Sequence, residues 1–368
     1  MSAVVTSPPT TSWLDDVFDR PGSVRTLALL RLVLGPVVLV HLWPFLAMTS
    51  GGRTYRDTFF EPWWGFAPVP PGWVQVVLVW TGAVAAVALA AGWRTRLVGP
   101  LTWLCVAGNL FLSQHHFRHN RAFLLFLLGA VALADSGRVL SVDSLRRRLA
   151  GRPVDDRATL WPLWLLRALA ASVYLASGIS KLVDRDWVGG LVLWDRAVRH
   201  QHLVHDRLPD LLADPVVDLV TARWVHAITS PIAVAMELFI GLGLWFGRTR
   251  LAAIWTAVFF HVSIELSASV EVFSLAAIAA LVIWAEPSTR DRVVVTHDGR
   301  WIRRLDWLAR FDVREVPGAP LAVTDRDGTV RTGDGAAWLV RSRLPLLFPF
   351  VAPAHAVRSV RRRTREAT

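Results

Sequence analysis

Cysteine and lysine are almost absent from this sequence of 368 residues. The single cysteine, Cys105, excludes an intrachain disulfide and a zinc site built from cysteines. The first 25 residues lack the basic start and early apolar core of a cleaved signal peptide, so we expect the first hydrophobic segment to remain as an anchor. Of the 40 lysine and arginine residues, one is a lysine, Lys181. Arginine therefore supplies the positive charge almost everywhere.

Hydrophobic residues, in contrast, make up 53% of the chain, and the mean hydropathy is +0.40. Many of the 19 tryptophans, such as Trp43, Trp73, Trp245 and Trp284, lie near the ends of apolar runs, where the ring favours the lipid headgroups. The net charge of +11 comes from arginines in short loops and near the C-terminus, which membrane topology explains better than nucleic-acid binding. These patterns predict a multi-pass protein of the cell membrane, with the lipid bilayer as its partner and no nucleic acid.

Eight apolar segments predict an all-α polytopic membrane bundle of about eight transmembrane helices. The segments are residues 26–48, 73–93, 97–112, 122–133, 160–182, 228–246, 251–266 and 272–284. The third, fourth and eighth are short and would need flanking residues, tilt within a bundle or a re-entrant path. Arginine is densest after the even-numbered segments, which predicts cytoplasmic N and C termini and places residues 113–121 and 183–227 outside.

The composition divides the chain into a polar segment (residues 1–22), a transmembrane domain (23–286) and a basic tail (287–368). In the tail, charged and β-branched stretches separated by turn signals at residues 297–299 and 325–328 predict a small cytoplasmic α/β module. We expect its arginine end, residues 361–363, to meet anionic headgroups. Arg-Thr-Arg-Leu occurs at residues 94–97 and 248–251, which is compatible with two four-span halves or with two similar positive-inside turns.

Lys181 is the strongest functional candidate, because it closes the fifth apolar segment at the predicted outer membrane edge. A partly desolvated amine can lose its proton near neutral pH and act as a base or nucleophile, whereas a guanidinium stays protonated. On a helix, Tyr174, Gly178 and Lys181 share one face, and Gly178 leaves room beside the amine. The alternative is a lysine that anchors a helix end at the headgroups, a role that arginine also fills.

Further polar groups are predicted on the same outer side. His119 and Asn120 lie in the histidine-rich third loop, and His261 and Glu265 lie one helical turn apart in the seventh segment. The loop histidines could instead be solvated, and the His261–Glu265 pair could be structural. Glu237, in the sixth segment, is expected to pair within the bundle. The histidine spacing matches no metal motif, so no metal is predicted.

The segment from Tyr174 to Leu182, followed by Trp187 and Gly190, resembles part of vitamin K-dependent γ-glutamyl carboxylase. Bacterial relatives of that enzyme carry the horizontally transferred transmembrane (HTTM) domain. Two shorter stretches resemble the family in the same order: His119-Asn120 with residues 135 and 141–143, and Phe260-His261 with residues 273–274. The similarity covers roughly residues 20–286.

The resemblance implies that Lys181 is the base that deprotonates reduced vitamin K or a menaquinone-type quinol, whose reaction with oxygen yields an alkoxide that takes a glutamate γ-proton. It also implies catalytic roles for His119, Asn120 and His261. The assisting histidine of the family falls on Asn120, with His119 beside it in inverted order. The carboxylase's large extramembrane β-rich region has no counterpart here, so processive carboxylation is not expected.

Three functions therefore remain open. The first is a membrane enzyme that acts on a quinol or a secreted peptide, with Lys181 as base. The second is a non-enzymatic partner in peptide maturation, export or immunity, similar to a sporulation-delaying-factor protein. The third, a transporter with an ion site near Glu237 and Glu265, lacks an evident inverted repeat. The sequence sets no oligomeric state.

The tail is similar to a degenerate thioredoxin-like DCC domain, on the basis of residues 297–299, 325–328 and 333–336. That domain is named for an Asp-Cys-Cys motif. Because the tail contains no cysteine, this resemblance implies a scaffold without thiol redox activity.

Overall fold

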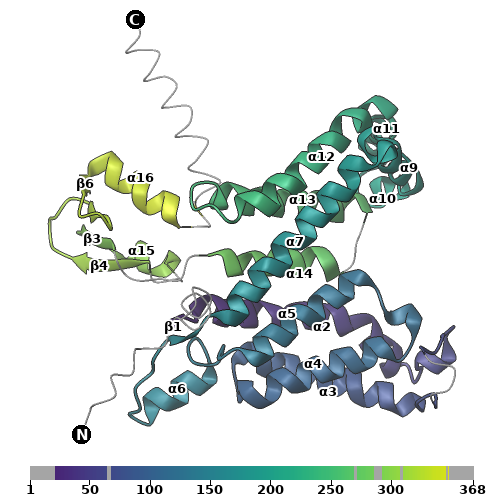
Figure 1. The fold of residues 1–368 in the computed structure, drawn as a ribbon, viewed down its shortest axis with the longest axis horizontal. Helices are drawn as coiled ribbons and strands as arrows, with labels where there is room; N and C mark the ends of the chain where they lie inside the picture. Colours follow the sequence, from purple (N-terminus) through teal and green to yellow (C-terminus); the bar gives the residue numbers. More distant parts are fainter. Residues whose placement is uncertain are drawn as a thin grey trace, which may run out of the picture. The chain divides into compact units, whose positions relative to one another are not determined.

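The computed structural model describes residues 21–63, 68–268, 272–285, 292–306, 310–344 and 347, and it is mostly helical (Figure 1). The polar segment 1–20 and the arginine end 361–363 lie outside the described residues. The chain forms two compact units, Met1–Ala168 and Leu169–Thr368. Helix α7 (Trp161–Val183) runs through the boundary between them.

The first unit contains four long helices that pack against one another in chain order. They are α2 (Arg25–Ser50), α3 (Gly72–Ala91), α4 (Thr95–Phe111) and α5 (His119–Leu133). Shorter elements are η1 (Tyr55–Asp57), η2 (Gln114–His116), α6 (Val142–Leu149) and the antiparallel strands β1 (Pro21–Ser23) and β2 (Arg157–Thr159). Each long helix coincides within a few residues with one of the first four apolar segments, since a helix satisfies its own backbone hydrogen bonds in an apolar setting.

A buried arginine ties helix α2 to the end of helix α3. The Arg31 side chain is fully buried, and its guanidinium donates to the carbonyl oxygens of Leu89 (2.8 Å) and Ala90 (2.9 Å). These carbonyls belong to the last turn of α3, where few backbone N–H groups remain to bond them; the Leu89 carbonyl oxygen also accepts from the Gly92 N–H at 2.9 Å. Gly92 ends the helix with φ at +70°, and a Cβ there would collide with the guanidinium. Arg31 thus acts as the cap of a neighbouring helix.

The second unit begins with four short helices in the long connection that follows α7. They are α8 (Arg185–Val188), α9 (Leu191–Arg199), α10 (His202–His205) and α11 (Asp210–Thr221). Three apolar helices follow, α12 (Arg223–Gly243), α13 (Arg250–Ala268) and α14 (Val272–Ala280), the last continued by η3 (Leu281–Trp284). Trp284 is 1% exposed and meets the edge of the Trp245 ring at 5.0 Å, so it packs inside the protein rather than at a lipid interface.

The C-terminal module is a four-stranded sheet with two helices, which confirms the predicted small α/β module. Its elements are β3 (Arg292–Thr296), α15 (Arg300–Leu305), β4 (Phe311–Glu315), β5 (Ala322–Thr324), β6 (Val330–Thr332) and α16 (Gly333–Arg343). The strand order is β4-β3-β5-β6, with β3 parallel to β4 and the other pairs antiparallel. Its core contains Val294, Ile302, Phe311, Val323 and Leu339.

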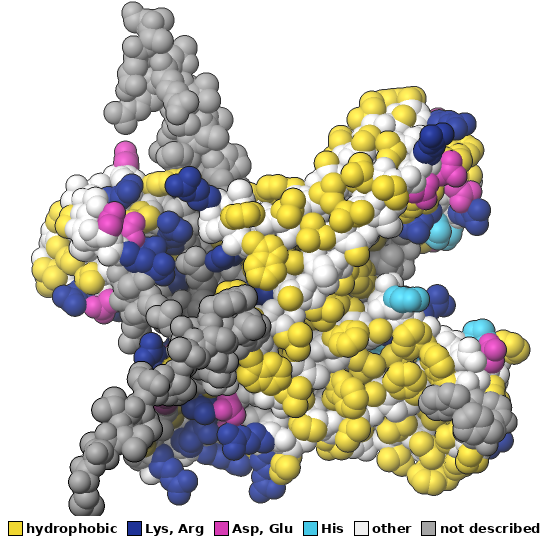
Figure 2. Space-filling view, in the orientation of Figure 1, with side chains coloured by type: hydrophobic (Ala, Val, Ile, Leu, Met, Phe, Trp, Pro, Cys, Tyr) yellow, Lys and Arg dark blue, Asp and Glu magenta, His cyan; other side chains and the backbone are white. Residues whose placement is uncertain are grey.

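Four helices in the described part of the chain are long and apolar enough to span a membrane, namely α2, α3, α7 and α12. Large apolar side chains such as Trp43, Trp73 and Phe259 are more than 60% exposed. Figure 2 shows hydrophobic side chains spread over the helices, whereas arginines gather around α6 and on the C-terminal module. This distribution fits helices that face lipid. The remaining apolar segments are also helical, and a total of eight spans stays a prediction.

Candidate functional site

Helix α7 presents Ser177 and Lys181 to helix α12. The Lys181 ammonium donates to Glu237 Oε1 at 2.6 Å, and the Ser177 hydroxyl donates to the same oxygen at 3.0 Å. The Glu237 side chain is 5% exposed and the Lys181 side chain 19%. The expected pairing of Glu237 is therefore confirmed, and its partner is the one lysine of the chain.

Two glycines allow α7 and α12 to approach each other closely. A Cβ on Gly178 would lie 2.9 Å from Leu238 Cδ2 and 3.4 Å from Glu237 Cβ. A Cβ on Gly241 would lie 2.6 Å from Leu175 Cγ. The space left by Gly178 is thus occupied by α12 rather than being open beside the amine. This packing brings the Glu237 carboxylate within reach of Lys181.

Trp187 covers the other side of the amine, since Lys181 Nζ lies 4.7 Å from the centre of its ring. Helix α8 holds the tryptophan in place: the Asp184 carboxylate accepts from the backbone N–H of Asp186 (2.9 Å), and Ser230 donates to the Trp187 carbonyl. Lys181 thus lies between a buried carboxylate and an aromatic face, two partners that both attract a cation.

Tyr174 and His261 form a second polar contact, two helical turns below Lys181 on α7. The tyrosine hydroxyl lies 2.7 Å from His261 Nε2, and His261 is 1% exposed among the rings of Phe260 and Phe273. No hydrogen bond joins His261 to Glu265 in the described structure; His261 Nδ1 and Glu265 Oε2 are buried without partners. One-turn spacing places His261 and Glu265 on one face of α13, but the partner of the imidazole is Tyr174 on α7.

His119 and Asn120 lie at the start of α5, in the first unit. His119 is exposed and meets the Phe117 ring at 6.0 Å. The neighbouring His116 is more enclosed: its Nδ1 lies 3.0 Å from the Asn109 carbonyl oxygen, and burial lowers the pKa of its ring below the usual value, helped by the charge of Arg121.

A buried polar cluster around this loop was not predicted from the sequence. Gln75 accepts from the Tyr55 backbone N–H (2.6 Å) and donates to Asn109 Oδ1 (3.1 Å). His41, 5% exposed, has an Nε2 atom without a partner in the described structure. The sequence does contain a sign of this cluster, since His41, Gln75 and Asn109 each lie inside an apolar segment. A polar side chain buried in a membrane helix needs a partner within the protein.

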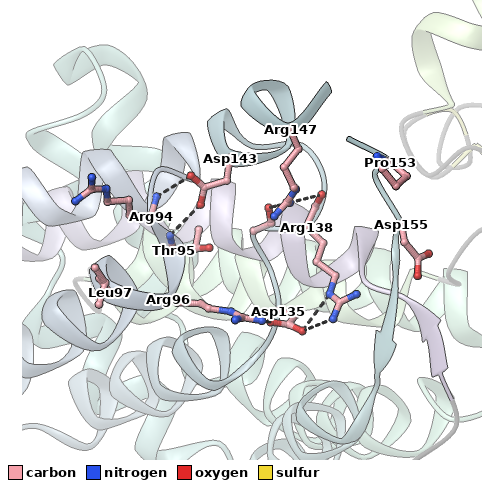
Figure 3. A pocket seen from close by; sticks show the side chains of 11 residues that line it. Arg94, Thr95, Arg96, Leu97, Asp135, Arg138, Asp143, Arg147, Pro153 and Asp155 are labelled. Carbon is pink, nitrogen blue, oxygen red and sulfur yellow. Dashed lines mark hydrogen bonds and ion pairs between the residues drawn. The ribbon is translucent and has the colours of Figure 1, made fainter. Parts of the chain in front are cut away.

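Asp135 and Asp143, two residues of the stretches compared above, serve as structural supports (Figure 3). The Asp143 carboxylate accepts from the backbone N–H groups of Arg94 (3.0 Å) and Thr95 (3.2 Å), where α4 begins. Asp135 pairs with Arg138 (2.7 Å) and with Arg96 (3.1 Å). These pairs line a cavity of about 590 Å³ in which arginines and aspartates nearly balance. In the described part of the chain, no group of three or more histidine, cysteine, aspartate or glutamate residues is placed to hold a metal ion.

Comparison with known proteins identifies the family of this chain. No curated protein and no solved structure matches this sequence. The model of the HTTM domain matches residues 19–288, a range that contains all the long apolar helices and the Lys181–Glu237 pair. This match spans well over half of the chain, and the protein therefore belongs to the HTTM domain family.

Proposed function

We propose that this HTTM protein is a multi-pass protein of the cell membrane, with about eight spans and cytoplasmic termini, that uses Lys181 as a base at the outer face. Its substrate would be a reduced quinone of the vitamin K or menaquinone type, or a secreted peptide. The observation that carries the proposal is the position of the only lysine, held by a buried glutamate where an arginine would serve as well for simple anchoring.

The surroundings of Lys181 fit a lipid-soluble quinol. Leu182 and Val183, which follow the lysine on α7, are 54% and 76% exposed, so an apolar molecule could approach from the hydrocarbon side. Trp187 offers a flat face beside the amine. A quinol supplies an acidic hydroxyl, and Lys181 Nζ is the group that would accept its proton.

Glu237 would have to free the amine before that step. Across the 2.6 Å between Nζ and Oε1, one proton of the Lys181 ammonium would pass to the carboxylate, which leaves a neutral amine that can accept the proton of the quinol, while Ser177 remains bonded to the same oxygen. The contact between Tyr174 on α7 and His261 on α13 would help to hold the Lys181–Glu237 pair in this geometry. His119 and Asn120 keep the assisting roles that the family resemblance implies.

The test is epoxide formation from reduced vitamin K and oxygen by purified protein in lipid, compared between wild type and Lys181→Arg. The arginine keeps the positive charge and should preserve folding, but it should abolish turnover because a guanidinium stays protonated and cannot accept a proton from the quinol. Ser172→Ala is the matched control on α7, because Ser172 is exposed and donates to the Leu169 carbonyl oxygen of its own helix. Equal turnover in wild type and Lys181→Arg would refute the base role.

A second candidate is a non-enzymatic partner in peptide maturation, export or immunity. The ion pair between α7 and α12 favours it, since such a pair also links two helices structurally. In that case Lys181→Arg would retain the biological activity of the protein, and wild type would show no epoxide formation. A secreted peptide would then bind as a partner rather than as a substrate.

A further inference from the structure

Helix α6 keeps two leucines outside the packed first unit. Leu145 is 55% exposed and Leu149 is 80% exposed, and the two lie one helical turn apart on the same face. The opposite face is fixed to the protein, because Arg147 donates to the carbonyl oxygens of Gly137 and Arg138, each at 3.0 Å. An apolar ridge held outward on an otherwise polar helix is typical of helices that lie on a membrane.

Two arginines flank this leucine ridge. Arg146 and Arg148 lie about 80° to either side of it around the helix, and both are exposed. Figure 2 shows arginines gathered around α6. Within the part of the chain that the structure describes, neither guanidinium has a hydrogen-bond or ion-pair partner. The four aspartates of the connection between α5 and α7 bond to other arginines or to backbone N–H groups; they are Asp135, Asp143, Asp155 and Asp156. The two arginines are therefore free to meet an anionic partner outside the protein.

Helix α6 is fixed to the end of α3, which is long and apolar enough to span a membrane. The Asp143 carboxylate of α6 accepts from the backbone N–H groups of Arg94 and Thr95 (Figure 3). The N–H of the same aspartate donates to the Gly92 carbonyl oxygen at 3.1 Å. Trp93, in the same turn between α3 and α4, is 38% exposed, and tryptophan favours the level of the headgroups. The turn thus holds α6 at the height of the membrane surface.

We propose that α6 lies in the plane of the membrane surface and binds anionic phospholipids. Leu145 and Leu149 enter the acyl chains, and Arg146 and Arg148 contact the phosphate groups. A planar guanidinium matches two phosphate oxygens, and each arginine near an anionic surface adds to the attraction. Arginines that only mark the cytoplasmic side would not need a leucine ridge between them. The inference rests on the membrane-spanning arrangement proposed above and is independent of the chemistry at Lys181.

A spin label measures the depth of α6 in the full-length protein. Leu149→Cys carries the label, and the native Cys105, which is 4% exposed, should stay unlabelled. The protein is placed in nanodiscs of phosphatidylcholine alone, or of phosphatidylcholine mixed with phosphatidylglycerol. Accessibility of the label to oxygen and to a water-soluble nickel complex gives its depth. In a separate sample, a label at Val84→Cys reports on the middle of α3, where Val84 is 69% exposed.

The test variant adds Arg146→Gln/Arg148→Gln to Leu149→Cys, and it should fold because both arginines are exposed. The matched control adds Arg300→Gln/Arg304→Gln on α15. It removes the same charge from two exposed arginines one turn apart, on a helix whose apolar residues pack in the module core. With phosphatidylglycerol, we expect the label at position 149 to lie in lipid. The test variant should lower the ratio of lipid-exposed to water-exposed label by roughly tenfold or more, and the control should leave this ratio unchanged.

The two labels separate failure of this inference from failure of the proposed spans. A label in water at position 149, with the label at position 84 in lipid, would overturn the inference and leave the α3 span intact. Labels in water at both positions would overturn both. Equal insertion in the two lipid compositions, or equal loss in the test and control variants, would refute binding of anionic phospholipids by the two arginines.

Discussion

The Lys181–Glu237 pair predicts a measurable coupling between two residues 56 positions apart. We consider Lys181→Met, Glu237→Gln and the double variant. Removing one partner of a buried ion pair leaves a charge without compensation and costs about 3–5 kcal/mol. Because 19% of the Lys181 side chain reaches solvent, we expect a cost somewhat below this range, about 2–3 kcal/mol for each single variant.

The double variant should be less destabilised than the sum of the single variants. It contains no buried charge at this contact, and the amide introduced at position 237 needs no cation, while its oxygen can still accept from Ser177. A coupling energy of about 2 kcal/mol or more is therefore expected. Unfolding by SDS in mixed micelles, followed by circular dichroism, measures all four proteins, with Ser172→Ala as a neutral control. Additivity of the two single variants within about 0.5 kcal/mol would show that the contact stabilises nothing.

Two further variants test the supports of the first unit. Gly92→Ala should destabilise by roughly 2–4 kcal/mol, because its φ of +70° is unfavourable and its Cβ would meet Arg31 and Ser141. Gly52→Ala, with φ of +71° and open space, should cost about 1 kcal/mol by the same unfolding assay. Equal costs would contradict close packing of Arg31 and Ser141 around Gly92. Burial raises the pKa of Asp135. Hydrogen bonds and charges from Arg138 and Arg96 outweigh this effect and hold the pKa below the usual 3.8. The native state is then stabilised above the unfolded-state pKa, and this contribution is lost as pH falls through the lower folded-state value. The stability difference between wild type and Asp135→Asn, about 1 kcal/mol at pH 7, should vanish in acid, and a difference that persists there would rule out the carboxylate's charge as its source.

The helices were the most predictable part of this protein. Every one of the eight apolar segments is helical, because a long apolar run without turn residues has no other way to satisfy its backbone in an apolar setting. The connection after α7 was less clear. The sequence predicts one long outer segment there, whereas the structure has four short helices. Each is too short for its amphipathic pattern to be distinguished from that of a polar loop.

Side-chain partners were harder to predict than helices. The shared face of Tyr174 and Lys181 follows from helix periodicity, and the structure confirms it. The choice of partner depends on how neighbouring helices are rotated and how closely they approach, which Gly178 and Gly241 decide. For this reason the sequence predicts that Glu237 is paired but not with which residue, and it gives no sign of the contact between Tyr174 and His261.

The contact between Arg31 and the end of α3 also bears on how the protein enters a membrane. An arginine within an apolar helix is costly in hydrocarbon until its donors find acceptors. Its acceptors at Leu89 and Ala90 are synthesised 58 and 59 residues later. Neither α2 nor α3 alone can form these bonds, and a further bond of the same guanidinium, to the Leu140 carbonyl oxygen, needs the chain beyond α5. We therefore expect the α2–α3 hairpin to begin, and the segment at Leu140 to complete, the accommodation of Arg31 within the lipid.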